Sequence, residues 1–412
     1  MTTAITIIWA IAVLYSLKNT KWLLAITILA LPTYQIRFAL GNIPVTLLEI
    51  SILILFAQWF FTQEKTRIKS LYEEYKNLFR FIAVLLIAAS ISIFTSPDTT
   101  AAAGIWKAYF LEPILFFTVF IDVVRTKKEL RLVVNALAFV AAAIAIATVA
   151  QALNWLPTLE PWKTDHRYTG LFPYPNAVGL FLAPLIPIFV ASSKCLCKRW
   201  DSILLMLTAL ISLLAIFMAQ SEGAVVALTG SIIIWGLFRG RRFRFGSITA
   251  IITAIFIIQT QPLILDKLLL KDWSGTVRRL MWQDTVTMIT HHPIAGAGLS
   301  GYPAAFAKYH KHPAIEIFQY PHNIILNTWS EIGLLGLIAF IAIIAYFGFI
   351  LLTRPKTKHS YFQHALGVSM LILVIHGIVD VPYFKNDLSI LFWIIVGMLI
   401  ANPHIDTDTK KT

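Results

Sequence analysis

Charged residues are scarce in this sequence. Only 13% of the 412 residues are Asp, Glu, Lys or Arg, whereas 58% are hydrophobic. A soluble domain typically carries about 25% charged residues, and a soluble core stops growing near this length, so it cannot take up such an apolar surplus. The surplus must face lipid, and the composition therefore predicts an integral membrane protein.

Cysteine is scarcer still, and signals for secretion or repetition are missing. Cys195 and Cys197 are the only cysteines, which excludes a disulfide framework and a four-cysteine metal site. The N-terminal MTTAITIIWAIAVLYSL lacks a basic n-region and a small-residue cleavage site, so we interpret it as a retained membrane segment. We find no repeat of fixed period and no low-complexity tract, and we expect residues 1–412 to form a single membrane domain.

Long apolar runs, in contrast, are abundant. A membrane-spanning helix needs about 20 mostly apolar residues, and the sequence offers 12 or 13 candidate spans, which predicts an all-α polytopic membrane protein. The candidates cover roughly residues 3–17, 22–34, 45–61, 79–95, 105–124, 130–152, 175–192, 202–219, 222–238, 246–261, 323–351, 362–380 and 388–402.

Positive charge is confined mainly to short loops between these runs. The net charge is +13, from 34 Lys and Arg against 21 Asp and Glu, but no basic-aromatic module indicates nucleic-acid binding. Short basic loops mark the cytoplasmic side of a membrane protein. They lie near residues 18–21, 65–80, 125–131, 194–199, 239–244, 354–358 and 410–411. The alternation from residue 45 onward predicts a cytoplasmic C-terminus and leaves the N-terminal orientation open.

The opposite, outer side has one long connection. Most outer segments are short, whereas residues 262–322 form an extracytoplasmic loop of the length that is usually functional. We expect this loop to carry short helices and the chemistry of the protein. Its histidines are His291, His292, His310, His312 and His322.

A basic helix and a glycine turn occupy the middle of this loop. Residues 276–290 show apolar positions at helical spacing, with Ser274 as a candidate cap and Arg278 and Arg279 in the first turns. The following HHPIAGAGLSGYP is a tight turn whose exposed N–H groups, with the nearby guanidinium groups, would suit phosphate oxygens. An interfacial helix followed by an ordinary glycine turn is the alternative interpretation.

Polar residues mark the point where the loop re-enters the membrane. The segment YPHNIILNTWSEIGLLG places His322 and Asn323 at a helix start, with Glu331 further along. An imidazole at a membrane surface can act as a base near neutral pH. Alternatively, His322 is a capping or interfacial residue without a chemical role.

Three further outer segments carry candidate residues. Arg167 precedes Asn176 in RYTGLFPYPNAVG, Glu222 lies in QSEGAV, and His376 and Asp380 lie four residues apart in HGIVDVPYFKNDL. An acid such as Glu222 at a membrane boundary is costly unless it is paired or functional. The alternative interpretations are a capping amide for Asn176, an interfacial acid for Glu222 and a local ion pair at a helix end for the last segment.

Together these segments resemble the O-antigen ligase and O-antigen polymerase superfamily. The resemblance runs from about Arg167 to about Gly336, and the first third of the chain matches only as a run of spans. It rests on Arg167–Tyr168–Thr169–Gly170 with Pro175–Asn176, the Ser221-x-Gly223-Ala224 element, Arg278 or Arg279 ahead of Trp282, His292–Pro293 with Gly296 and Gly298, and the His322–Asn323…Leu326…Glu331-x-Gly333 signature.

The resemblance implies a multi-span glycosyltransferase with a GT-C-like arrangement of helices and no need for a cofactor or a divalent metal. Such enzymes of the bacterial inner membrane take a glycan from a polyprenyl (undecaprenyl) pyrophosphate carrier on the outer face. They pass it to a hydroxyl of the lipid A core, of a growing glycan or of a protein, in the biosynthesis of lipopolysaccharide and other surface polysaccharides. The expected partners are therefore the bilayer, the lipid-linked donor and a glycan or lipid acceptor, and no nucleic acid.

The resemblance also implies roles for single residues. His322 is the candidate base, Arg278 or Arg279 the candidate pyrophosphate ligand, and Asn323, Glu331 and Asn176 are candidate supporting residues. One position departs from the family pattern, because Glu222 stands where the family often has Arg, and an acid repels pyrophosphate. Either Arg167 supplies the missing positive charge, or Glu222 orients an arginine or the acceptor.

The residues are consistent with the chemistry that the resemblance implies. A pyrophosphate leaving group needs fixed cations, a sugar hydroxyl needs a base, and the sugar centre passes through an oxocarbenium-like state. Transfer therefore requires His322 to converge on one cavity with at least one of Arg167, Arg278 and Arg279. A transporter or flippase of lipid-linked glycans, which would show a polar path through the bilayer centre, and a non-catalytic scaffold are the alternatives. The choice among ligase, polymerase and protein glycosyltransferase stays open.

Overall fold

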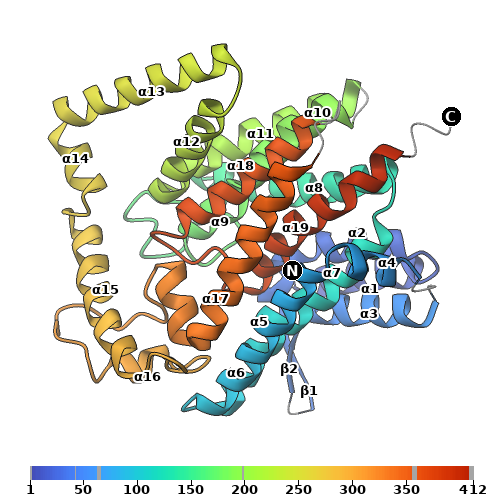
Figure 1. Ribbon diagram of the computed structural model, residues 1–412, viewed down its shortest axis with the longest axis horizontal. Helices are drawn as coiled ribbons and strands as arrows, with labels where there is room; N and C mark the ends of the chain where they lie inside the picture. The colour runs from blue at the N-terminus through green and yellow to red at the C-terminus, as the bar shows by residue number, and fades with distance from the viewer. Residues whose placement is uncertain (1, 42, 63–65, 197–198, 355–359, 408–412) are drawn as a thin grey trace.

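The computed structural model describes residues 2–41, 43–62, 66–196, 199–354 and 360–407. Cys197 and several residues that the charge pattern places on the cytoplasmic side, namely Lys65, Lys198, Lys356, Lys358, Lys410 and Lys411, lie outside the described residues. Helices make up most of the described chain, and its two strands form one antiparallel hairpin (Figure 1).

The elements follow one another as α1 (Thr2–Ser16), α2 (Thr20–Leu29), η1 (Leu31–Gln35), β1 (Arg37–Leu40), β2 (Ile43–Thr46), α3 (Leu47–Thr62), α4 (Thr66–Glu74), α5 (Lys76–Thr95), α6 (Thr99–Trp106), η2 (Lys107–Leu111), α7 (Glu112–Val123), α8 (Lys127–Ala152), α9 (Asn176–Leu182), α10 (Leu185–Cys195), α11 (Arg199–Met218), α12 (Glu222–Leu237), α13 (Arg241–Thr260), α14 (Pro262–Leu268), α15 (Trp273–His291), α16 (Tyr302–Phe306), α17 (Ile324–Thr353), α18 (Ser360–His376) and α19 (Asn386–Thr407).

The predicted all-α polytopic membrane fold is confirmed. Each candidate span coincides with one helix or with consecutive helices. Among the described residues, seven helical stretches are long and apolar enough to cross a membrane, or eight if the bent pair α3–α4 is one span, and five further apolar helices have 10–17 residues. The total of 12 or 13 crossings stays a prediction, because a short helix crosses only where the bilayer thins or flanking segments complete the span.

Several spans are interrupted where proline or glycine occurs. Pro32 lies in η1, which follows α2 directly, and Pro184 lies between α9 and α10. The longest helix, α17, contains a kink at Ile332 and Gly333, where the φ angle of Gly333 is 69°. Proline removes a helical hydrogen bond, and glycine accepts a positive φ that other residues resist, so these positions set where the helices break.

The last described helix forms the core of the bundle. Every residue of α19 from Leu388 to Ala401 is buried by neighbouring helices. The ring of Trp393 packs on Phe117 of α7 with ring centroids 4.9 Å apart. Because α19 contacts α7, α17 and α18, it fixes the position of the segment that precedes it, which carries part of the candidate site.

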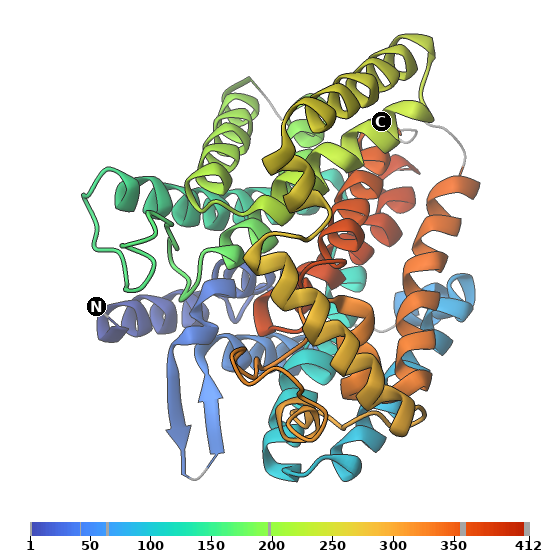
Figure 2. The same ribbon diagram turned by 90° about the vertical axis from the view of Figure 1, so that its left-hand side faces the viewer.

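One end of the bundle carries the long connections. We call it the loop end; it holds residues 153–175, residues 262–322 and the β1–β2 hairpin, which projects from the body of the molecule (Figure 2). Predicted cytoplasmic loops instead pair with one another, as in the ion pair between Lys21 and Glu129. The separation of the long connections from the short basic loops agrees with the alternation of these two kinds of loop along the sequence.

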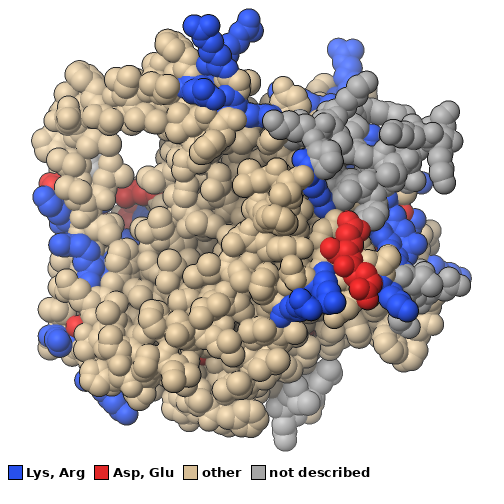
Figure 3. Space-filling model, in the orientation of Figure 1, with Lys and Arg blue, Asp and Glu red and all other residues tan. Residues whose placement is uncertain are grey.

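Helices α13 and α14 stand away from the bundle as an arm. Helix α13 crosses α12 closely at one point, where a Cβ added to Gly236 would lie 2.1 Å from Ser247 Oγ. Helix α14 returns to the first residue of α12 through an ion pair between Lys267 and Glu222. Between these two contacts the space-filling view shows an opening through the molecule (Figure 3). Ser247 is the only buried residue in the described helix α13, so the rest of this helix is available to lipid.

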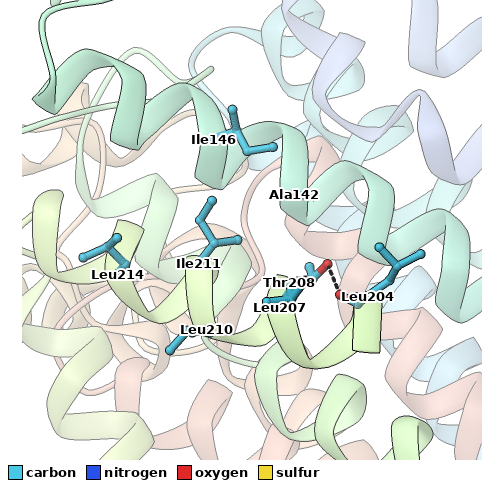
Figure 4. Close-up of a pocket in the computed structure, with 8 residues that line it drawn as sticks. All are labelled: Ala142, Ile146, Leu204, Leu207, Thr208, Leu210, Ile211 and Leu214. Atoms are coloured by element: carbon cyan, nitrogen blue, oxygen red, sulfur yellow. Dashed lines mark hydrogen bonds between the residues drawn. The ribbon is translucent and has the colours of Figure 1, made fainter. Parts of the chain in front are cut away.

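A second hollow lies between α8 and α11 (Figure 4). It has a volume of about 520 Å³ and is lined by apolar side chains such as Ile146, Leu207 and Leu214. Its one hydroxyl, that of Thr208, donates to the carbonyl of Leu204 at 2.9 Å. The walls therefore suit a hydrocarbon chain, and the chemistry must lie elsewhere.

Candidate active site

His322 and Asp380 lie together at the loop end. His322 directly precedes the N-cap of α17, and Asp380 follows α18 in the turn that leads to α19. His322 Nδ1 and Asp380 Oδ1 are 3.3 Å apart, and Asp380 is only 3% exposed. A carboxylate that accepts a hydrogen bond from Nδ1–H leaves Nε2 available to take a proton, which is how a general base is oriented.

The start of α17 holds His322 in an unusual conformation. The φ angle of His322 is 48°, a left-handed value that is uncommon for a residue with a side chain. Next to it, the side chain of Asn323 caps α17 by accepting two backbone N–H groups of the first turn, both at 3.0 Å. The amide of Asn323 also donates to the carbonyl of Ile378 at 2.9 Å. Asn323 thus ties the helix start to the turn that carries Asp380.

Aromatic side chains restrict the imidazole further. The rings of Tyr320 and Phe318 lie edge-on to the ring of His322, with centroid distances of 4.7 and 5.4 Å. Trp282 of α15 donates its indole N–H to the carbonyl of Pro321 at 2.8 Å. The long loop and the start of α17 are therefore joined at the residue before the candidate base.

The surroundings of Asp380 favour its ionised form. Burial alone would raise the pKa of this carboxyl, but the hydrogen bond and charge of His322, the charge of His376 and the N–H of Val381 outweigh it, and the pKa is lowered. A lowered pKa in the folded state contributes stability above the ordinary carboxyl range, and that contribution is lost as the pH falls through the lowered value. At neutral pH, Asp380 is therefore a carboxylate facing His322.

Asn176 connects this carboxylate to an arginine. Asn176 Nδ2 donates to Asp380 Oδ2 at 3.4 Å, and Arg167 Nη2 donates to Asn176 Oδ1 at 2.9 Å. Arg167 Nε also donates to the carbonyl of Ala219 at 3.4 Å, and its guanidinium lies 5.5 Å from the ring centroid of Trp162. Pro175, not Asn176, occupies the N-cap of α9, so Asn176 serves the site and not as a helix cap.

The two adjacent arginines of α15 differ in their surroundings. Arg278 lies within electrostatic reach of Arg167 and of His376. It donates to Ser274 Oγ at 2.7 Å, while its buried Nε has no hydrogen-bond acceptor among the described residues. Arg279 is exposed, and its one side-chain hydrogen bond to a described residue goes to Thr276 Oγ1 at 3.5 Å. The geometry therefore places Arg278, and not Arg279, next to the other site residues.

Arg167 and Arg278 lie within electrostatic reach of one another, and Nε of Arg278 has no hydrogen-bond acceptor among the described residues. Burial lowers the pKa of Arg167, and the charge of Arg278 adds to this effect, while Asp165 and Glu222 oppose it. An arginine stays charged in spite of such shifts. Like charges held close together favour the approach of an anion, and guanidinium groups bind phosphate oxygens in pairs.

Glu222 is paired with a lysine of the arm. Its carboxylate binds the ammonium of Lys267, and this hydrogen bond raises the pKa of Lys267. Both side chains are more than half exposed, at 62% and 53%, so the pair contributes little to stability. Lys267 neutralises the acid at this position. Arg167 lies within electrostatic reach of Glu222.

The glycine turn is not a phosphate cradle, and the prediction of exposed N–H groups is wrong. The N–H of Ala297 donates to the carbonyl of Ser330, that of Leu299 to Ser92, and those of Gly296 and Gly301 to carbonyls within the turn. A Cβ on Gly296 or Gly298 would lie within 2.4–2.5 Å of neighbouring backbone atoms. The turn is glycine-rich because it packs against α17 and the end of α5.

Two further expectations also change in the structure. The N-cap of α15 is Asp272, whose carboxylate accepts the N–H of Gly275 at 3.2 Å, so the prediction of Ser274 as the cap is wrong. Glu331 accepts the N–H of Ser300 at 2.6 Å. Its buried carboxylate fastens the glycine turn to α17 and does not face His322.

The structure thus brings four residues into one hydrogen-bonded chain, Arg167–Asn176–Asp380–His322, with Arg278 nearby. Sequence reasoning placed Asp380 in a local pair with His376 and did not include it among the site residues. The segment HGIVDVP did carry a signal, because it puts an acid just beyond the outer end of a span. Among the described residues, no group of three His, Cys, Asp or Glu is arranged to hold a metal ion.

Part of the chain is similar to a known protein family. No curated protein matches the chain. Residues 207–341 match the family model described as O-antigen ligase. The matched part contains Glu222, Arg278, His322 and Glu331, whereas Asp380 lies beyond it. Over these residues, about a third of the chain, the protein is similar to the O-antigen ligase family.

Proposed function

We propose that this protein transfers a glycan from a polyprenyl pyrophosphate carrier to a hydroxyl acceptor at the outer face of the bacterial inner membrane, as an O-antigen ligase or polymerase does. The proposal includes a cytoplasmic C-terminus and a reaction that needs no divalent metal. The observation that carries it is the hydrogen-bonded chain that links Arg167 to His322 through Asn176 and Asp380.

The base in this reaction is His322. Its Nε2 takes the proton of the acceptor hydroxyl while Asp380 keeps Nδ1 protonated and stabilises the imidazolium that forms. The acceptor oxygen then bonds to the anomeric carbon, and the bond from that carbon to the pyrophosphate oxygen breaks. The rings of Tyr320 and Phe318 keep the imidazole from turning away during this step.

The leaving pyrophosphate is bound by Arg167 and Arg278. Negative charge develops on the leaving oxygen, and fixed cations stabilise it more strongly than water does. Asn176 orients Arg167 by hydrogen bonding, and the buried Nε of Arg278 has a donor to offer. Arg279 has no part in this proposal, because it is exposed.

The carrier reaches the site from the membrane. The opening framed by α12, α13 and α14 (Figure 3) ends at the Glu222–Lys267 pair, beside Arg167. Its walls at membrane depth are apolar helices, so a hydrocarbon chain in the opening places its anionic head near the two arginines. The groove between α8 and α11 is apolar too, but no arginine lines it.

The test is transfer of a radiolabelled glycan from polyprenyl pyrophosphate by purified protein in lipid, with and without EDTA. We expect transfer by the wild type in both conditions and a loss of about 10²–10⁴-fold in His322→Ala, the usual contribution of a general base. His292→Ala is the matched control, because this imidazole is exposed in the same loop.

The outcomes separate the alternatives. A His322→Ala protein that is folded and as active as the wild type would remove the base assignment. Loss of activity in EDTA, restored by a divalent ion, would remove the metal-free mechanism. Movement of the carrier across the bilayer without glycan transfer would replace the enzyme by a transporter.

A further inference from the structure

A polar pocket lies at the end of the bundle opposite to the loop end. Helix α8 begins beside this pocket and leads at its other end into residues 153–175. The pocket has a volume of about 280 Å³, whereas one water takes about 30 Å³ of liquid, so it has room for a group much larger than a water or a metal ion. We call it the basic pocket; it is lined by Lys18, Asn19, Thr20, Lys21, Asp122, Val123 and Arg125.

The lining of the basic pocket carries more positive than negative charge. Lys18, Lys21 and Arg125 are basic, and Asp122 is the one acid among the lining residues. Asp122 is buried, and both of its carboxylate oxygens already accept hydrogen bonds within the fold. Oδ1 accepts from Arg125 Nη2 at 2.9 Å, and Oδ2 accepts the indole N–H of Trp59 at 2.8 Å. The pocket therefore favours an anion over a cation.

The guanidinium of Arg125 is fixed but still has a donor to offer. Its Nε donates to the backbone carbonyl of Asp122 at 2.7 Å, and its Nη2 donates to the carboxylate of the same residue. Its Nη1 has no acceptor among the described residues, and the side chain is 49% exposed. A guanidinium that is already oriented binds phosphate oxygens with little further loss of conformational freedom.

The two lysines of the pocket differ in their partners. Lys21 forms an ion pair with Glu129, whose other carboxylate oxygen accepts the N–H groups of Arg125 and Thr126 at 2.6 and 2.8 Å. Lys18 is exposed, and its ammonium makes no ion pair or hydrogen bond with the described part of the chain. Positive charge that only orients a protein in the membrane does not have to be held around a hollow. The arrangement therefore indicates a bound anion.

Exposed apolar side chains flank the basic pocket along the chain. Leu14 and Leu17 precede Lys18 and are 67% and 39% exposed, and Trp22, directly after Lys21, is 55% exposed. They belong to the apolar helices α1 and α2 and to the turn between them. Such surfaces face lipid in a membrane protein, and tryptophan is enriched at the level of the lipid headgroups. An anion that carries hydrocarbon chains would match both the pocket and its surroundings.

We propose that the basic pocket binds a phosphate group, the phosphodiester of an anionic membrane lipid whose acyl chains lie against α1 and α2. Arg125 and Lys18 contact the phosphate oxygens, and Lys21 adds positive charge beside them. Basic pockets between membrane helices on the cytoplasmic side are typical sites for anionic lipid heads, and the charge pattern predicts this side for residues 18–21 and 125–131. The inference does not depend on the proposed function, because the pocket and His322 lie at opposite ends of the bundle.

The test is equilibrium binding of tritiated phosphatidylglycerol to purified, delipidated protein in a neutral detergent, measured by scintillation proximity. Unlabelled phosphatidylglycerol, phosphatidylcholine and inorganic phosphate are the competitors. We expect phosphatidylcholine to compete at least about fivefold more weakly than phosphatidylglycerol, because its choline cancels the charge of the phosphate. Inorganic phosphate should not compete at the same concentrations, since it lacks the acyl chains.

Substitution of Lys18 assigns the binding to the pocket. Lys18→Gln should weaken phosphatidylglycerol binding about fivefold and Lys18→Glu about 25-fold, because each unit of charge near an anionic lipid contributes about fivefold. Neither change removes a contact with a described residue, so both variants should keep the melting temperature of the delipidated wild type. Lys69→Glu is the matched control, because Lys69 is exposed on the same predicted side and does not line the pocket. Its affinity should stay within about twofold.

Each other outcome overturns the inference. Equal losses in Lys18→Glu and Lys69→Glu would show a general attraction of anionic lipid to a basic surface, and wild-type affinity in Lys18→Glu would show that the lipid binds elsewhere. Competition by inorganic phosphate as effective as that by phosphatidylglycerol would show a site for a free anion in place of a lipid head. Glycan transfer is not measured in this experiment, so a failure of the proposed function would leave its result unchanged.

Discussion

At the level of single residues, the adjacent arginines of α15 provide a sharp comparison. Both fit the family pattern ahead of Trp282, and sequence spacing does not distinguish them. In the folded chain, Arg278 lies near Arg167 and His376, whereas Arg279 is exposed. The difference arises because neighbouring positions on a helix point about 100° apart, so only one of them faces the bundle.

We therefore predict that Arg278→Ala lowers kcat/KM for glycan transfer by about 10²–10³-fold, the usual loss when one fixed donor to a developing charge is removed. Arg279→Ala should stay within about threefold, since exposed charges are screened by salt. Initial rates at several donor concentrations measure both effects. Equal losses in the two variants would show that the assignment of Arg278 is wrong.

Residue-level prediction from sequence reached the arginines and His322 but missed two neighbours. The sequence predicts His322 as a candidate because it lies where the long loop re-enters the membrane and because it matches the family signature. Asp380 is not predicted in this role, because its partner is 58 residues away and nothing local distinguishes it from a helix-end acid. The contacts of the Lys385 ammonium with the rings of Tyr34, Phe172 and Tyr174 could not be predicted for the same reason, since these residues lie far from Lys385 in the chain.

At the level of elements, hydropathy predicts where the helices are but not where they bend. The kink of α17 falls at Gly333, where a Cβ would lie 2.1 Å from the carbonyl oxygen of Ile294. That contact joins the helix to the glycine turn, which Glu331 fastens from the other side. A glycine in an apolar run signals a possible bend, but the packing partner that demands it cannot be inferred from the run alone.

We expect Gly333→Ala to destabilise the protein by at least about 1–3 kcal/mol, because the positive φ and the close carbonyl both resist a side chain. Gly348→Ala in the same helix is the control. A Cβ there meets no atom within 4 Å, so its melting temperature should be unchanged or slightly raised. Melting temperatures followed by tryptophan fluorescence in detergent test the pair; equal values in both variants would contradict the packing argument.

At the level of the whole molecule, the two ends of the helix bundle carry different loops, and this difference predicts a fixed orientation in the membrane. The loop end carries the candidate site, and the other end carries the short basic loops. Helix α13 connects the two ends of the bundle, because it begins with a cluster of arginines and leads through α14 into the long loop. Its exposed apolar surface, including Ile255 at 50% exposure, should lie in lipid.

Cysteine labelling in a background with Cys195→Ser and Cys197→Ser tests this orientation. In sealed right-side-out vesicles, a membrane-impermeant maleimide should label Lys271→Cys and should spare Arg242→Cys, both exposed positions. Ile255→Cys should react only with a lipid-soluble reagent. Labelling of Arg242→Cys in place of Lys271→Cys would reverse the sidedness inferred from the basic loops.

The separation of His322 and Asp380 by α18 has a consequence for biogenesis. A ribosome delivers His322 and α17 to the insertion machinery before α18 exists, and in the proposed orientation Asp380 reaches the side of His322 only after α18 has crossed. Until then the imidazole has no carboxylate partner and Asn176 has no link to it. If the proposed function holds, a half-inserted chain therefore lacks the paired base that glycan transfer needs, and the last steps of insertion complete the site.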